Sequence, residues 1–183
     1  MTTRRDFLKT MTMASAGLAL GTGDLLGAPI SVSQRKAAAD KVKIAYVGIG
    51  NRGEQIIGDF ARTGMVEVVA LCDVDMGAPH TQKVMNMYPK AKRFRDFRQM
   101  FDKAGNDFDA VAIATPDHSH FPITMLALAS GKHVYVEKPL ARTFYEAELL
   151  MQAALKRPNL VTQVGNQGHS EANYFQFKAW MDA

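Results

Sequence analysis

The chain has 183 residues and 47% hydrophobic content, which is enough to fill one packed core but not two large ones. Its formal net charge is +4, but residues 1–39 hold five basic and two acidic side chains, so the rest of the chain carries only about +1. A nearly neutral body lacks the basic surface of a nucleic-acid-binding protein. The single cysteine, Cys72, excludes an intramolecular disulfide, and its apolar surroundings predict a buried thiol.

Residues 1–39 have the features of an export signal and linker. Thr3-Arg4-Arg5-Asp6-Phe7-Leu8-Lys9 resembles the twin-arginine signal, whose pattern Ser/Thr-Arg-Arg-x-Phe-Leu-Lys it matches at every position. The resemblance implies export of the folded protein to the periplasm, with membrane contact only through the signal. Cleavage is expected either after 37–39, before Asp40, or after 26–28, where Pro29 disfavours the cut.

From residue 41 onward, short apolar runs alternate with helical patterns. The expected strands are 42–47, 66–72, a short segment at 93–94, 109–114, 133–136 and 160–164. The first expected helix begins at Gly53. Further helices are expected at 81–87, 121–130 and 143–156, with a helical turn at 97–101. This alternation predicts the α/β class, with a Rossmann-type doubly wound parallel sheet over residues 40–167.

Two features of the predicted helices stand out. In the helix at 143–156, Thr143 and Glu146 have the spacing of a capping box, followed by an apolar stripe of Ala147, Leu150, Met151, Ala154 and Leu155. A last helix, with Ser170 as its cap, places Tyr174, Phe177 and Met181 on one side and leaves Phe175 and Trp180 uncovered. Residues 168–183 are therefore interpreted as the start of a truncated C-terminal region whose substrate domain is missing.

A glycine motif between the first strand and the first helix predicts dinucleotide binding. In Gly48-Ile49-Gly50-Asn51-Arg52-Gly53, the first glycine allows a tight turn, the second lets a pyrophosphate approach, and the third lets the helix pack closely. Asp73 follows the second strand, 20 residues after Gly53, where an acid binds the adenosine ribose and repels a 2′-phosphate. This favours NAD; Arg52, which the motif places near the same pocket, softens that preference and leaves NADP possible.

Three further motifs follow strands four, five and six, at the carboxyl ends where α/β sheets bind ligands. They are Thr115–His120, Glu137–Pro139 and Gly165–His169. Together with Gly48–Gly53 and Cys72-Asp73 they resemble the Gfo/Idh/MocA oxidoreductase family, and the resemblance spans residues 41–183. It implies an NAD(P)-dependent enzyme that acts on a sugar-like small molecule.

The resemblance also implies a role for each matched residue. Lys138 corresponds to the family's catalytic lysine, whose ammonium bonds a substrate hydroxyl and stabilises an alkoxide as hydride leaves. Glu137 would lie near the nicotinamide ribose, and the bond before Pro139 is often cis. The remaining expected cofactor contacts are Thr115 and Pro116 on the nicotinamide side, His120 close to the nucleotide, and Asn166 near the nicotinamide end.

In this family a second domain supplies the proton-transfer residues and most substrate contacts, and the subunits typically pair through it. The resemblance therefore implies that residues 1–183 alone do not complete the active site, and that the full-length protein is a homo-oligomer. The polar residues Asp117, His118, His120 and His169 give only a weak metal pattern, and no metal site is expected.

The leading functional hypothesis is a periplasmic dehydrogenase or reductase for sugars, cyclitols or glycosides. One alternative is an NAD-dependent glycosidase of the same fold, which breaks a glycosidic bond through transient oxidation. The lysine of Glu-Lys-Pro is typically replaced in that group, so Lys138 favours the dehydrogenase. The other alternative is a non-catalytic nucleotide-binding fragment.

Overall fold

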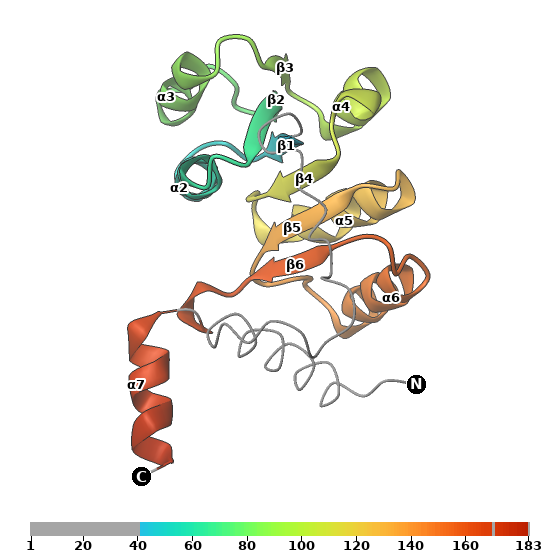
Figure 1. Cartoon of the computed structure of the whole chain (residues 1–183). Coiled ribbons are helices and arrows are strands. Elements are labelled where there is room, and N and C mark those ends of the chain that lie inside the picture. Colours follow the sequence, from blue (N-terminus) through green and yellow to red (C-terminus); the bar gives the residue numbers. More distant parts are fainter. Residues whose placement is uncertain (1–40, 170, 183) are drawn as a thin grey trace, which may run out of the picture. The chain divides into compact units, whose positions relative to one another are not determined.

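A parallel sheet forms the centre of the described part of the chain. The computed structural model describes residues 41–169 and 171–182, so the predicted export signal lies outside the described residues. Six parallel strands pair in the order β3-β2-β1-β4-β5-β6 (Figure 1). Their bounds are β1 Val42–Val47, β2 Val66–Cys72, β3 Lys92–Phe94, β4 Ala110–Ile113, β5 His133–Glu137 and β6 Thr162–Gly165. The strand order reverses between β1 and β4, so the predicted Rossmann-type α/β fold is confirmed.

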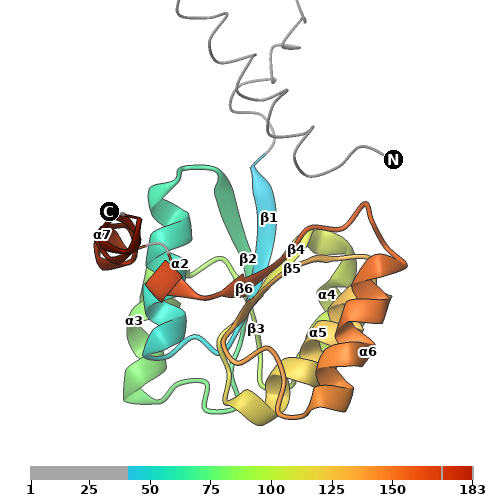
Figure 2. The same cartoon turned by 90° about the horizontal axis from the view of Figure 1, so that it is seen from below.

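Helices cover both faces of this sheet. The helices are α2 Arg52–Arg62, α3 Pro79–Met87, α4 Phe97–Ala104, α5 His120–Ala129, α6 Phe144–Leu155 and α7 Ala172–Met181, with short 3-10 turns at Gly105–Asp107, Asp117–Ser119 and Gln167–His169. Helices α2 and α3 lie on one face, and α4, α5 and α6 lie on the other (Figure 2). Right-handed crossovers between parallel strands produce this division, because the chain changes face where the strand order reverses.

The core consists of two apolar clusters, one on each face of the sheet. Along β1, Ile44 and Tyr46 belong to the cluster under α2 and α3, whereas Ala45 and Val47 belong to the cluster under α4, α5 and α6. This alternation follows from the two-residue period of a strand. Because both faces are covered, every one of these four positions is buried, which explains the continuous apolar run in the sequence.

The capping box predicted for α6 is confirmed. The Thr143 hydroxyl accepts from the Glu146 N–H at 3.2 Å, and the Glu146 carboxylate accepts from the Thr143 N–H at 3.2 Å. The apolar stripe is only partly buried: Leu150 is 3% exposed, whereas Met151 is 56% and Leu155 is 72% exposed. Helix α6 packs mainly against α5, so part of its apolar face stays exposed.

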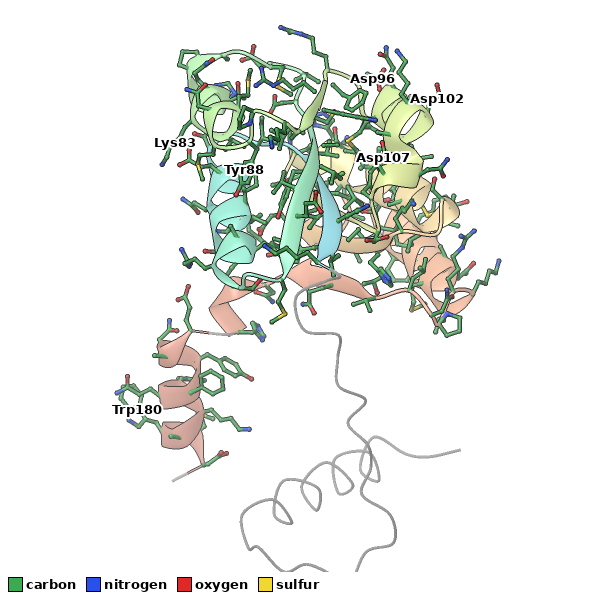
Figure 3. All side chains as sticks on the ribbon, turned by 45° about the horizontal axis from the view of Figure 1, so that its top comes forward. Lys83, Tyr88, Asp96, Asp102, Asp107 and Trp180 are labelled. Carbon is green, nitrogen blue, oxygen red and sulfur yellow. The ribbon has the colours of Figure 1, made fainter. Side chains whose placement is uncertain are left out.

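Helix α7 differs from the other helices because it buries no side chain among the described residues. Phe175 is 60% exposed and Trp180, labelled in Figure 3, is 69% exposed, as the sequence predicts. The helix begins one residue later than expected, with Glu171 at its N-cap position. The cap predicted at Ser170 is therefore wrong, and Ser170 itself lies outside the described residues.

Candidate cofactor-binding site

The glycine motif forms the turn between β1 and α2, at the carboxyl edge of the sheet. Gly48 has φ +81°, and a Cβ built there would lie 2.5 Å from the carbonyl oxygen of Ala114. A Cβ on Gly53 would collide with the carbonyl oxygen of Gly48. Both positions therefore require glycine, Gly48 for the left-handed backbone and Gly53 for close packing of helix on strand.

The start of α2 is open to an anion. Asn51 occupies the N-cap position with φ 47°, and its side chain makes no capping hydrogen bond. The unpaired N–H groups of a first helical turn, together with the positive end of the helix dipole, attract phosphate. The geometry at Gly50 and Asn51 thus suits the pyrophosphate of a dinucleotide.

A cleft of about 600 Å³ lies beside this turn, in the size range of small-molecule and cofactor sites. Six residues predicted to contact the cofactor line it: Gly48, Gly50, Asn51, Asp73, Thr115 and Pro116. The cleft lies where β1 and β4 separate, the position at which open α/β sheets bind their ligands.

Asp73 holds the walls of the cleft in place. One carboxylate oxygen accepts from the Ile49 N–H at 3.0 Å, and the other accepts from the Asp75 N–H at 2.9 Å. The side chain of Ile49 is fully buried in the core, so this residue contributes its backbone rather than its side chain. Each carboxylate oxygen has a second lone pair, which leaves Asp73 able to accept from a ribose hydroxyl.

Thr115 supplies a buried polar atom that the protein leaves unsatisfied. Its Oγ1 is buried and has no hydrogen-bond partner among the described residues. Such a group normally pairs, and Thr115 lines the cleft, so its hydroxyl is a polar group that a bound ligand can pair; the unpaired Tyr46 hydroxyl, by contrast, lies in the core. The residues present therefore fit a dinucleotide, with a glycine cradle for phosphate, Asp73 for a ribose and Thr115 for a polar group.

Glu137, at the end of β5, lies at the centre of a polar network. It is 5% exposed. Its Oε1 accepts from Gln167 Nε2 at 2.6 Å, the Tyr135 hydroxyl at 3.0 Å and Arg52 Nη2 at 3.2 Å. Burial raises the pKa of the Tyr135 phenol, so it stays protonated and donates at neutral pH. This network joins the glycine-motif helix to the strand that carries Glu-Lys-Pro.

Arg52, at the start of α2, binds the end of β5. Its guanidinium contacts Glu137 and Gln55, and it does not line the cleft beside Asp73. No contact joins Arg52 to Asp73 among the described residues, so the predicted influence of Arg52 on the choice between NAD and NADP stays a prediction. The buried carboxylate of Glu137 attracts the guanidinium across the strand ends, whereas the oxygens of Asp73 already accept from backbone N–H groups.

The buried His120 ring joins the motif that follows β4 to the Glu-Lys-Pro motif that follows β5. The side chain is buried, with Nδ1 at 2.6 Å from the Pro139 carbonyl oxygen and Nε2 at 2.8 Å from that of Thr115. It does not line the cleft, so its contact with the nucleotide stays a prediction. The Lys138–Pro139 bond is cis, as the resemblance implies. Lys138 and Asn166 are exposed and lie outside the cleft lining.

Several residues around the site were not identified from the sequence. Arg95 donates to the carbonyl oxygens of Val74 and Met76, at 3.2 and 2.7 Å, and so holds the loop after β2. The His80 ring lies against Gly50, and Asp96, labelled in Figure 3, caps α4. No short motif marks Arg95 or His80, because they reach the site through the fold, whereas Asp96 has the local signal of an N-cap residue directly before a helix.

Other chemistry near the site is limited. Burial raises the pKa of the Cys72 thiol to about 12, so this cysteine is protonated and unreactive, as predicted. Among residues 41–169 and 171–182, no three His, Cys, Asp or Glu side chains gather as a metal site would require. None of the described helices has the length and apolar content of a membrane span.

The sheet order, the open turn before α2 and the acid after β2 together define a dinucleotide-binding Rossmann domain. The model of the Gfo/Idh/MocA family, described as an oxidoreductase family with an NAD-binding Rossmann fold, matches residues 42–165. The chain belongs to this family, and its Rossmann domain is of the NAD-binding type.

Relatives of known name fall into two groups. A glycosyl hydrolase family 109 protein of Shewanella pealeana is 31% identical over 167 residues, covering 82% of this chain and 36% of the relative. An alpha-N-acetylgalactosaminidase of Shewanella oneidensis is 29% identical over 169 residues, with the same coverage of 82% and 36%. The chain thus spans well under half the length of these two relatives.

The second group consists of solved structures. A scyllo-inositol dehydrogenase of Lactobacillus casei with bound NAD(H) and scyllo-inositol is 28% identical, with a TM-score of 0.67 over 78% of this chain and 41% of that one. The apo form of that enzyme gives 27% identity and a TM-score of 0.68, with the same coverage of 78% and 41%.

Proposed function

We propose that the protein is an NAD-dependent oxidoreductase that transfers hydride between the nicotinamide and a hydroxyl or keto carbon of a sugar, cyclitol or glycoside. The observation that carries this proposal is the ion pair between Arg52 and Glu137, which places Glu-Lys-Pro beside the glycine turn. The scyllo-inositol dehydrogenase with bound NAD(H) and scyllo-inositol supports the class of substrate.

In this proposal NAD, when bound, accepts or returns the hydride, and the protein supplies position and charge. Gly50 and the first turn of α2 hold the pyrophosphate, and Asp73 holds the adenosine ribose. The Lys138 ammonium donates to the substrate hydroxyl and stabilises the negative charge that develops on its oxygen. Thr115 and Pro116 would contact the nicotinamide side from the cleft wall, and Asn166 would approach it from outside that wall. The proton of the substrate hydroxyl would pass to an acceptor in the second domain proposed below.

The test uses the complete protein that contains this chain, incubated with NAD+ and scyllo-inositol as the first substrate probe. We expect NADH to accumulate in proportion to the oxidised product. Replacing the lysine, Lys138→Gln, should lower kcat by a factor of about 10² or more, because a charged group positioned to stabilise the developing alkoxide contributes that much to such a step. The matched control is Lys90→Gln, an exposed lysine on a loop remote from these motifs.

A second candidate function is an NAD-dependent glycosidase of the same fold. The names of the curated relatives, glycosyl hydrolase family 109 protein and alpha-N-acetylgalactosaminidase, favour it. The retained lysine at position 138 favours the dehydrogenase. With an α-N-acetylgalactosaminide as substrate, a glycosidase releases the sugar while total NAD+ stays constant, whereas a dehydrogenase forms NADH without release.

We also propose that residues 1–39 direct the folded protein to the periplasm through the twin-arginine pathway. The match at positions 3–9 supports this, and export after folding suits an enzyme that must acquire its nucleotide in the cytoplasm. Replacing both arginines by lysine, Arg4→Lys with Arg5→Lys, should keep the protein in the cytoplasm. Unchanged recovery from the periplasm would contradict this localisation.

The matched relatives are longer than this chain, and their additional length bears on how the proposed enzyme is completed. We propose that a C-terminal substrate domain follows residues 168–183 and that the full-length protein forms a homo-oligomer through it. The partial coverage of the relatives supports the additional domain. A complete protein that binds NAD+ but turns over neither substrate class would instead favour a non-catalytic nucleotide-binding role.

A further inference from the structure

The environment of Glu137 is asymmetric, and this asymmetry suggests how the carboxylate is used. Three donors, from Gln167, Tyr135 and Arg52, all reach Oε1. Among the described residues no donor reaches Oε2. Oε2 is not among the buried side-chain atoms that lack a partner, so it is open to solvent and free to accept a hydrogen bond from a ligand.

The donors come from three separate parts of the fold. Arg52 starts α2, Tyr135 lies two residues before Glu137 on β5, and Gln167 follows β6. Gln167 Nε2 also lies 3.3 Å from the Tyr135 hydroxyl, so these two donors brace each other. A carboxylate held from three directions has little freedom to rotate, and its second oxygen therefore keeps one orientation.

Gly165 makes room for this arrangement. A Cβ at position 165 would lie 2.6 Å from Glu137 Oε1 and closer still to the Tyr135 hydroxyl. Any other residue there would push the two oxygens apart. The absence of a side chain at Gly165 is thus required by the neighbouring Tyr135 and Glu137 side chains. Its backbone conformation does not require glycine, because its φ is not positive.

We propose that Tyr135 and Gln167 are positioning residues that fix the Glu137 carboxylate so that Oε2 accepts from a hydroxyl of the nicotinamide ribose. The inference rests on the proposed function, because it requires NAD at this edge of the sheet. Tyr135 and Gln167 do not line the cleft, and in this proposal they act only through Glu137. Arg52 contributes as well, but it also lies beside the phosphate turn, so its loss would affect more than one part of the cofactor.

The test compares two ligands of the complete protein. NAD+ carries the nicotinamide ribose, whereas ADP carries only the adenosine and the pyrophosphate. For Tyr135→Phe and Gln167→Leu we expect the dissociation constant of NAD+ to rise about fivefold to tenfold, while that of ADP changes less than twofold. The matched control is Tyr145→Phe, which removes a hydroxyl from a side chain that is 69% exposed on α6.

A double-mutant cycle separates positioning from simple stability. In a Glu137→Ala background the network has no carboxylate to hold, so adding Tyr135→Phe should leave NAD+ affinity unchanged within twofold. Equal losses of NAD+ and ADP affinity, no loss in either single variant, or full additivity in the Glu137→Ala background would each overturn the positioning role. Wild-type protein that binds neither ligand would overturn the proposed function as well, which distinguishes the two failures.

Discussion

At the scale of single residues, the glycines of the turn before α2 have different reasons for lacking a side chain. A Cβ at Gly48 would meet the backbone of Ala114, and the residue has φ +81°. A Cβ at Gly50 would meet only the ring of His80, which can turn away. The first glycine therefore serves the fold, whereas the second serves the approach of a ligand.

This difference predicts opposite outcomes for two substitutions. Gly48→Ala should lower the free energy of unfolding by about 2 kcal/mol or more, because a left-handed residue gains a Cβ against backbone. Gly50→Ala should leave stability within about 1 kcal/mol of wild type but weaken NAD+ binding. Denaturant unfolding and calorimetric titration measure the two effects. Gly58→Ala is the control, because a Cβ there meets nothing within 4 Å. Equal destabilisation by both turn variants would refute the distinction.

The buried thiol of Cys72 gives a second prediction at this scale. Its pKa of about 12 lies above the ordinary value of about 8.5, so at pH 8 alkylation by iodoacetamide should be at least about a hundredfold slower in the folded protein than after unfolding. The raised pKa also means that the unfolded thiol ionises first. The free energy of unfolding that burial of the neutral thiol contributes is therefore fully present below about pH 8.5, and it declines as the pH rises towards about 12. A thiol that reacts at the same rate in both states would show that Cys72 is accessible.

At the scale of elements, the start of α6 is determined by a local sequence pattern, whereas the burial of its apolar face depends on tertiary packing. The capping box is formed by residues three apart, so it depends on nothing outside the helix. The apolar stripe, by contrast, needs a partner surface. Leu150 finds one under the sheet, but Met151 and Leu155 remain exposed. Helix α7 is the extreme case, since its aromatic residues find no partner among the described residues.

The cap can be tested independently of the packing. Thr143→Ala should lower the free energy of unfolding by about 1 kcal/mol, the usual cost of losing an N-cap side chain. Glu146→Gln should be nearly neutral, because an amide oxygen can still accept from the Thr143 N–H. Chemical denaturation of both variants provides the measurement. If Glu146→Gln costs more than Thr143→Ala, charge rather than capping geometry stabilises the start of α6.

At the scale of the whole molecule, strands that are distant in sequence build one cleft. Its walls come from the ends of β1, β2 and β4, with Asp73 joining two of them through the Ile49 N–H. A ligand that binds only this assembled cleft must stabilise the entire folded state, because the unfolded chain offers no such site.

Thermal unfolding in the presence of nucleotides tests this coupling. NAD+ at about 100 times its dissociation constant should raise the free energy of unfolding by about 2.7 kcal/mol and shift the midpoint upward. NADP+ at the same concentration should have a smaller effect, because the Asp73 carboxylate repels a 2′-phosphate. A larger shift with NADP+ would show that Arg95 or Arg98, which also line the cleft, dominates over Asp73.

The sequence by itself determined the order and type of the elements, because strand and helix periods and the capping box are local patterns. It also placed Gly48, Gly50, Asp73 and Thr115 at strand ends, since parallel strands bring their carboxyl ends to one edge. Tertiary structure alone decided which side chains meet across that edge. Arg52 faces Glu137 and not Asp73, and His120 lies beneath the motifs it joins. Such contacts join residues up to 85 positions apart, and no local pattern carries the relative placement of two strand ends.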